Sequence, residues 1–141
     1  MASALPAALN DWFAARGWSP RRHQRDMLAA AETGQHALLV APTGAGKTLA
    51  GFLPVLADLI ETQHVGLHTL YVSPLKALAV DVQRNLLTPI DEMDLPIRVE
   101  TRTGDTPSDR KARQRVRPPH ILLTTPESLS LLLSYPDAAL L

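Results

Sequence analysis

One glycine-rich segment, Ala41-Pro42-Thr43-Gly44-Ala45-Gly46-Lys47-Thr48, constrains the fold of this chain more than any other feature. An apolar run at residues 36–41 leads into it and predicts a short buried strand, and a helical pattern from Lys47 to about Gln63 follows it. Gly44 and Gly46 permit backbone angles and a close approach that a Cβ would prevent, so successive N–H groups can surround phosphate oxygens at the positive end of the helix. A loop of this kind between a strand and a helix predicts a phosphate-binding site.

The chemistry of this loop is expected to rest on Lys47 and Thr48. The Lys47 ammonium would reach the β- and γ-phosphates of a nucleotide, and the Thr48 hydroxyl would ligate Mg²⁺. The general pattern G-x4-G-K-[ST] lacks its first glycine here, because Ala41 stands at that position. The alternative for the segment is a glycine-rich turn with an unrelated lysine.

Strand-like segments recur along the chain, and a helical pattern follows each of them. The expected strands lie at residues 36–41, 68–73, 97–102 and 120–125. The expected helices lie at residues 4–16, 21–33, 47–63, 75–90, 107–116 and 126–133, and Pro54 is expected to kink or divide the third. The fourth carries its apolar residues on one face, namely Leu75, Leu78, Val82, Leu86 and Ile90. This alternation predicts an α/β fold with a parallel sheet sandwiched by helices, where ligands bind beyond the carboxyl ends of the strands.

Composition excludes several classes of function. The chain has 141 residues, enough for one domain, and its 14 Lys and Arg balance 14 Asp and Glu, so net charge gives no indication of nucleic-acid binding. The absence of cysteine excludes disulfides, cysteine-ligated zinc, iron–sulfur clusters and thiol nucleophiles, and it favours a cytoplasmic protein. The apolar runs are far shorter than the ~20 residues of a membrane span, and no basic segment precedes a signal-like core at the start.

Charge is unevenly distributed even though it cancels overall. Residues 98–117 carry seven bases against three acids. The expected helix at residues 107–116 and its flank hold most of these bases, namely Arg110, Lys111, Arg113, Arg115 and Arg117. They either line a path for nucleic acid or form a solvated face. The five histidines show no spacing typical of metal ligands.

Further blocks give the chain a resemblance to a known family. A-P-T-G-A-G-K-T resembles motif I of superfamily 2 helicases, in which Ala commonly replaces the first glycine. Residues 17–24 (G-W-S-P-R-R-H-Q) resemble the stretch that carries an adenine-reading glutamine, and residues 71–79 (Y-V-S-P-L-K-A-L-A) resemble motif Ia. Thr103-Gly104-Asp105 and residues 124–129 (T-T-P-E-S-L) resemble the two motifs that grip the nucleic-acid backbone. The sequence of these blocks is similar to that of the large helicase-related (Lhr) group, and most like that of the ligase-associated DEXH-box DNA helicases of bacteria. The resemblance covers about residues 10–136.

The resemblance implies a P-loop NTPase, the first RecA-like helicase domain, with ATP and Mg²⁺ as cofactors. It assigns nucleotide binding to Gln24 through the adenine edge, to Arg21 over the adenine face, and to Thr43, Gly44, Ala45, Gly46, Lys47 and Thr48. Lys47 and Thr48 are the catalytic residues that it implies, with Thr48 as the Mg²⁺ ligand. It assigns nucleic-acid contacts to Ser73, Pro74, Lys76, Gly104, Asp105, Thr125, Pro126 and Glu127. The simpler alternatives are a surface glutamine at Gln24, a turn at Gly104-Asp105 and a helix cap at Thr125.

The resemblance also shows what these residues lack. The family's D-E-x-H motif and second RecA-like domain, with its arginine finger, do not occur in the 141 residues. We therefore expect an N-terminal part of a longer helicase, with N-terminal helices at 1–35 and a partial, truncated RecA-like domain at 36–141. By itself this part is expected not to hydrolyse ATP.

The function that the resemblance implies is an ATP-dependent DNA helicase in DNA repair, which couples ATP hydrolysis to translocation on DNA in the full-length protein. The implied partners are DNA, single-stranded or as a 3′- or 5′-tailed duplex contacted through its backbone, and a DNA ligase or nuclease encoded nearby. No membrane is expected. An RNA helicase and a nucleotide-gated nucleic-acid-binding module without turnover remain the alternatives.

Overall fold

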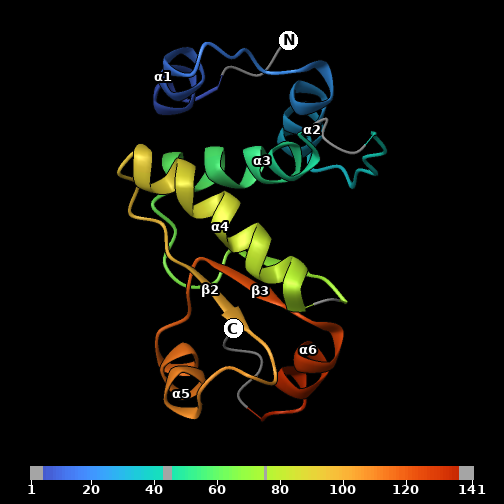
Figure 1. The fold of residues 1–141 in the computed structure, drawn as a ribbon, viewed down its shortest axis with the longest axis vertical. Helices are drawn as coiled ribbons and strands as arrows, with labels where there is room; N and C mark the ends of the chain where they lie inside the picture. Colours follow the sequence, from blue (N-terminus) through green and yellow to red (C-terminus); the bar gives the residue numbers. More distant parts are fainter. Residues whose placement is uncertain (1–4, 43–45, 75, 137–141) are drawn as a thin grey trace. The chain divides into compact units, whose positions relative to one another are not determined.

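The computed structural model describes residues 5–42, 46–74 and 76–136. The chain forms two compact units, one of residues 1–63 and 91–95 and the other of residues 64–90 and 96–141. The first unit holds α1 (Ala7–Ala15), α2 (Arg22–Glu32) and α3 (Lys47–Thr62) (Figure 1). The second holds β1 (Thr69–Val72), all but the last two residues of α4 (Lys76–Glu92), β2 (Val99–Arg102), α5 (Ser108–Val116), β3 (Ile121–Thr124) and α6 (Pro126–Leu133). The predicted domain boundary between residues 35 and 36 stays a prediction.

In the first unit, α2 packs against α3. The buried apolar side chains of α3 recur mostly at three-residue steps, which gives the helix one apolar stripe, and they are Ala50, Phe52, Leu53, Leu56 and Leu59. Leu28 of α2 and Leu9, Trp12 and Phe13 of α1 are buried as well. The helix runs through Pro54 without a division, so of the two expected outcomes the division does not occur, and a kink at this proline stays a prediction.

The segment 91–95 belongs to the first unit through a cluster around Glu92. The Trp12 indole N–H donates a hydrogen bond of 2.7 Å to the Glu92 carboxylate, and the Arg16 guanidinium forms an ion pair with the same group. The Arg16 guanidinium also lies 4.8 Å from the centre of the Trp12 ring. The hydrogen bonds from Arg16 and Trp12 hold the pKa of Glu92 below its ordinary value.

The strand predicted at residues 36–41 is wrong for this structure. Residues 35–42 have no regular secondary structure, and Leu38 and Val40 are 89% and 83% exposed. An apolar run indicates a buried strand only if neighbouring strands supply hydrogen bonds and cover both faces. The strand pairs in the described part of the chain join β1, β2 and β3 to one another and leave this segment out.

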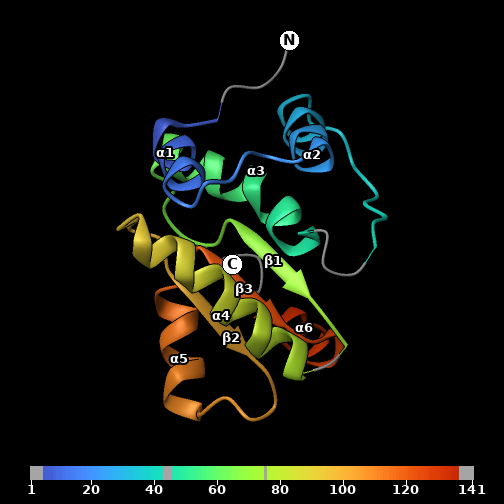
Figure 2. The same cartoon turned by 45° about the horizontal axis from the view of Figure 1, so that its top comes forward.

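The second unit is built on a parallel sheet with the order β1-β3-β2 (Figure 2). Thr69 of β1 and Val99 of β2 both stand opposite Ile121, and Val72 and Arg102 both stand opposite Thr124. All three strands therefore end level with one another. The central strand β3 is buried along its whole length, which explains its uninterrupted apolar run.

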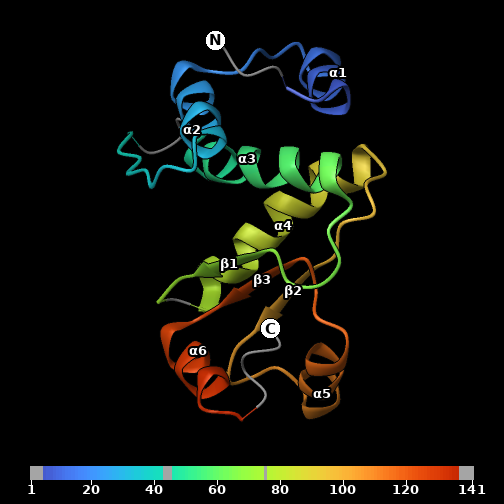
Figure 3. The ribbon, with the colours of Figure 1, turned by 180° about the vertical axis from the view of Figure 1, so that it is seen from behind.

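Helices cover both faces of this sheet. Figures 1 and 3 show α4 on one side and α5 and α6 on the other. This follows from the topology, because the crossover from β1 to β2 and the return from β2 to β3 run in opposite directions, and right-handed connections then place their helices on opposite faces. Val82, Leu86 and Ile90 of α4 are buried as predicted. Leu75 and the side chain of Leu78 lie outside the described residues.

Most element boundaries agree with the sequence within two residues. The predicted helix at 126–133 coincides with α6, and the helix at 107–116 begins one residue later because Pro107 is its N-cap. Within the described residues, the helices are too short or too polar to cross a membrane.

Candidate functional site

The candidate nucleotide site in the first unit is built around Gly46. This residue precedes α3 as its N-cap and has φ of 77°, in the left-handed region that favours glycine. A Cβ at this position would lie 3.0 Å from Nε2 of Gln24. Glycine is therefore required here both by the backbone conformation and by the close approach of a side chain from α2.

Lys47 and Thr48 form the start of α3, and both side chains are exposed. The N–H groups of the first helical turn have no intrahelical acceptor, so this end of the helix is suited to bind an anion. Thr43, Gly44 and Ala45, which complete the predicted loop, lie outside the described residues. The Thr48 hydroxyl is an oxygen ligand of the kind that Mg²⁺ prefers. Among the described side chains, no group of three or more His, Asp or Glu could hold a metal ion.

Gln24 is only 4% exposed, so it is not the surface glutamine of the simpler alternative. Its Oε1 accepts a hydrogen bond of 2.8 Å from the backbone N–H of Arg21, the N-cap residue of α2, so Gln24 helps to cap its own helix. That bond uses one of the two lone pairs of the amide oxygen and fixes the direction in which Nε2 faces. The structure thus places Gln24 against Gly46, whereas the Arg21 side chain is exposed.

The candidate nucleic-acid edge lies at the carboxyl ends of the three strands in the second unit. Ser73 follows β1, Thr103 follows β2 and Thr125 follows β3, and the register makes these ends level. The Ser73 N–H donates to the carbonyl of Thr124 over 3.0 Å, and the Thr124 hydroxyl donates to the carbonyl of Arg102 over 2.7 Å. Three blocks far apart in the sequence are therefore joined by hydrogen bonds at one edge.

The turn at residues 103–106 is braced by its own hydrogen bonds. The Thr103 N–H donates to the Thr106 hydroxyl over 2.9 Å, and the Thr106 N–H donates back to the Thr103 carbonyl over 3.2 Å. The Asp105 N–H donates to the Thr103 hydroxyl over 3.2 Å. Gly104-Asp105 therefore forms a turn, as the simpler alternative states, and this turn is held in one conformation at the candidate edge.

Lys76 and Asp105 form an ion pair across this edge. The Lys76 ammonium lies 2.9 Å from the Asp105 carboxylate, and both side chains are more than half exposed. A Cβ added to Gly104 would come within 3.9 Å of the same ammonium. An exposed pair of this kind contributes little to stability. It does, however, fix where the one described cation in the first turn of α4 lies.

Thr125 caps α6 through its side chain. Its hydroxyl oxygen accepts a hydrogen bond of 3.3 Å from the Ser128 N–H, and Pro126 occupies the first helical position. Glu127 lies in the first turn, where a carboxylate favours the positive end of the helix dipole, and both Pro126 and Glu127 are exposed. The cap weighed as an alternative is present at Thr125.

The bases of α5 do not form one surface. Arg113 lies 3.7 Å from the Glu100 carboxylate, and the Arg115 guanidinium lies 4.7 Å from the centre of the Tyr135 ring. The helix returns from the carboxyl end of β2 toward the start of β3, so Arg110 lies near the turn at residues 103–106 and Arg117 lies at the opposite edge. Of these residues, Arg110 is the exposed arginine best placed beside the candidate edge.

Comparison with known proteins places this geometry among helicases. Residues 21–139 match the family described as DEAD/DEAH box helicase. The chain is 44% identical, over 91% of its length, to "Lhr helicase/ probable uracil glycosylase" of Mycolicibacterium smegmatis, and 38% identical, over 95% of its length, to "ATP-dependent helicase Lhr-Core" of Methanothermobacter thermautotrophicus. It spans only 9% and 17% of the lengths of these two relatives.

A solved structure shows the same fold. The structure of Mycobacterium smegmatis helicase Lhr bound to ssDNA and AMP-PNP superposes with a TM-score of 0.83 and 42% sequence identity, over 94% of this chain and 18% of that one. The α/β, RecA-like fold and the resemblance to the Lhr group are confirmed by these matches. The roles of the individual site residues stay predictions.

Proposed function

This chain belongs to the DEAD/DEAH box helicase family, and from that premise we propose that it is the ATP-binding part of an ATP-dependent DNA helicase. The relatives named above include an ATP-dependent helicase, and such helicases are enzymes that hydrolyse ATP. In the full-length protein, the proposed role of the chain is to couple ATP hydrolysis to translocation on DNA. DNA repair is the proposed context, supported only by the likeness of the motifs to ligase-associated helicases. A nearby DNA ligase or nuclease as partner and a cytoplasmic location stay predictions.

The nucleotide is proposed to bind at the start of α3. Lys47 would contact the β- and γ-phosphates, the N–H groups after Gly46 would bind phosphate oxygens, and the Thr48 hydroxyl would hold Mg²⁺. Bound Mg²⁺ neutralises charge that develops on the phosphates during transfer. Gln24 supports this assignment because its side-chain amide lies directly against Gly46, beside the start of α3. Its proposed role is to contact the adenine edge.

The nucleic acid is proposed to bind at the carboxyl edge of the second unit, which we call the strand-end edge and define as Ser73, Pro74, Lys76, Gly104, Asp105, Thr125, Pro126 and Glu127. The observation that carries the proposal is that three separate blocks end at this edge in register, joined by hydrogen bonds. Backbone-rich turns, helix starts and one lysine suit phosphates rather than base edges. A motor that moves along DNA of any sequence needs contacts of this kind.

Two lysine substitutions test the proposal together. Lys47→Ala removes a charge-assisted contact worth ~1.5–3 kcal/mol, so ADP affinity measured by calorimetry should fall roughly 10- to 150-fold while single-stranded DNA affinity persists. Lys76→Ala should lower single-stranded DNA affinity while ADP affinity persists. Each variant is the matched control of the other. If Lys47→Ala leaves ADP affinity unchanged, Lys47 does not belong to the phosphate site. Tighter binding of oligouridylate than of oligothymidylate would favour the RNA helicase alternative.

A further inference from the structure

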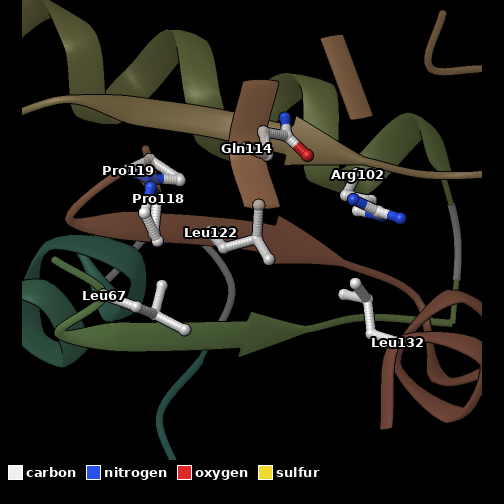
Figure 4. A pocket seen from close by; sticks show the side chains of 7 residues that line it. All are labelled: Leu67, Arg102, Gln114, Pro118, Pro119, Leu122 and Leu132. Carbon is white, nitrogen blue, oxygen red and sulfur yellow. The ribbon is translucent and has the colours of Figure 1, made fainter. Parts of the chain in front are cut away.

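Arg102 occupies a position in the second unit that the roles assigned above do not explain. It is the last residue of β2 and directly precedes the turn at residues 103–106. Its side chain is only 4% exposed, although arginine is rarely buried without partners. Figure 4 shows it at one end of a cleft that it lines with Gln114, Leu122 and Leu132.

The guanidinium of Arg102 binds two other elements. It donates a hydrogen bond of 3.2 Å to the backbone carbonyl of Lys111 in α5. It also lies beside the side chain of Tyr135, just beyond α6, whose ring is covered by the guanidinium of Arg115. Burial lowers the pKa of Arg102 from its ordinary value, and the Tyr135 contact acts in the opposite direction. One planar group thus holds the end of β2, α5 and the end of α6 together.

This arrangement continues from Arg102 to Lys76. The Arg102 carbonyl accepts the Thr124 hydroxyl, so its backbone is fixed in the sheet as well. The next residue, Thr103, takes part in three hydrogen bonds that brace the turn, and Asp105 of that turn forms the ion pair with Lys76. The turn that carries Asp105 starts directly at Arg102, so the guanidinium that binds α5 is linked through the backbone of residues 102–105 to the carboxylate that pairs with Lys76.

We propose that Arg102 is a positioning residue for the strand-end edge: it sets the place of Lys76 through the turn at residues 103–106, without touching nucleic acid. The proposal rests on the proposed nucleic-acid function of that edge. It adds a residue at which affinity is controlled from inside the fold. It also accounts for a buried arginine that donates to a backbone carbonyl and lies beside a tyrosine side chain rather than a carboxylate.

Two substitutions perturb this residue without removing the helix from the sheet. Arg102→Lys keeps the charge but replaces the planar fork with one ammonium, which cannot reach the Lys111 carbonyl and lie beside Tyr135 in the same geometry. Tyr135→Phe removes only the hydroxyl beside the guanidinium. In both variants α5 stays attached to β2, because the Gln114 amide donates to the Thr101 carbonyl over 3.1 Å. Arg98→Lys is the matched control, since Arg98 also donates to a backbone carbonyl, that of Pro118 over 2.7 Å, at the opposite edge of the sheet.

The test is a double-mutant cycle with Lys76→Gln on the whole 141-residue chain, with labelled oligothymidylate as the probe. Lys76→Gln should lower affinity and reduce the slope of log affinity against log salt by about 0.7. Arg102→Lys should lower affinity by a similar factor with the same loss of slope, Tyr135→Phe by less, and Arg98→Lys not at all. The variant with both Arg102→Lys and Lys76→Gln should bind no more weakly than Lys76→Gln alone.

Three results would overturn the role of Arg102. The first is a salt dependence of DNA affinity that Arg102→Lys leaves unchanged. The second is a loss of DNA affinity in Arg102→Lys that adds fully to the loss in Lys76→Gln. A residue that acts only on stability would give either result. The third is an equal loss in Arg98→Lys. Urea denaturation followed by far-UV circular dichroism verifies that the second unit of each variant is folded. If Lys76→Gln itself has no effect, the strand-end edge does not bind DNA, and the role of Arg102 is refuted with it.

Discussion

Gly46→Ala is expected to lower the free energy of unfolding, because of the backbone conformation at Gly46 and its contact with Gln24. A residue with a Cβ in the left-handed conformation costs about 1–2 kcal/mol. The new Cβ would also lie 3.0 Å from Nε2 of Gln24, so the glutamine must shift, and its 2.8 Å bond to the Arg21 N–H would weaken. Loss of such a bond costs about 0.5–1.5 kcal/mol. The free energy of unfolding should therefore fall by roughly 1.5–3.5 kcal/mol, to be measured by urea denaturation.

The same helix supplies the control. Gly51 lies in α3, is exposed, and has no atom within 4 Å of an added Cβ. Gly51→Ala should raise the free energy of unfolding by about 0.5–1 kcal/mol, because alanine loses less conformational freedom on folding than glycine. The two substitutions are thus expected to have opposite signs. A Gly46→Ala variant as stable as Gly51→Ala would refute the left-handed conformation and the contact with Gln24.

Three other predictions concern single side chains. Gln24→Ala should reduce the preference for ATP over GTP more than the affinity for phosphate, and an unchanged ratio in competition binding would make Gln24 purely structural. Arg110→Gln should reduce the salt slope of single-stranded DNA binding by about 0.7, whereas Arg117→Gln, at the opposite edge of the sheet, should leave this slope unchanged. Equal slopes in the two variants would argue against the strand-end edge. Burial is the main cause that lowers the pKa of His120 below 6.5, and the charge of Arg98 and the neighbouring His64 and His68 add to it. A hydrogen bond with the His64 backbone acts in the opposite direction. The unfolded chain then binds more protons, so stability should decrease as pH falls from 6.5 through the lowered value. In His120→Asn, whose side chain still offers an acceptor to the Arg98 N–H, the free energy of unfolding should depend less on pH. Urea denaturation between about pH 5 and 8 measures this, and a pH dependence identical to that of the unaltered chain would contradict the prediction.

The periodicity of the sequence predicts most of the second unit because its pattern is local. The central strand β3 is apolar and buried along its whole length, and Val82, Leu86 and Ile90 recur at helical spacing, so burial can be read from neighbours along the chain. The same rule fails at residues 36–41, since apolar residues do not reveal whether a partner strand lies beside them. Leu38 and Val40 are accordingly exposed.

The contacts that organise the candidate sites join residues remote in sequence, and no spacing rule reveals them. The ion pair of Lys76 with Asp105 and the contact of Arg102 with the Tyr135 side chain depend on how strands and helices are arranged. The arginines of α5 appear equivalent in sequence, yet Arg113 is paired with Glu100 and Arg115 covers Tyr135. The motifs locate the candidate residues, and the fold determines which of them are available.

The most direct test of the account is amide-resolved NMR of the ¹⁵N-labelled chain titrated separately with ADP and with oligothymidylate. ADP should shift the amide signals of Gly46, Lys47, Thr48 and Gln24. Oligothymidylate should shift those of residues 73, 76, 103–106, 125, 127 and 128, and should leave unchanged those at the opposite edge, residues 64–68 and 120. Shifts from oligothymidylate that centre on the opposite edge, or that spread evenly over both edges, would contradict a nucleic-acid site at the carboxyl ends of the strands.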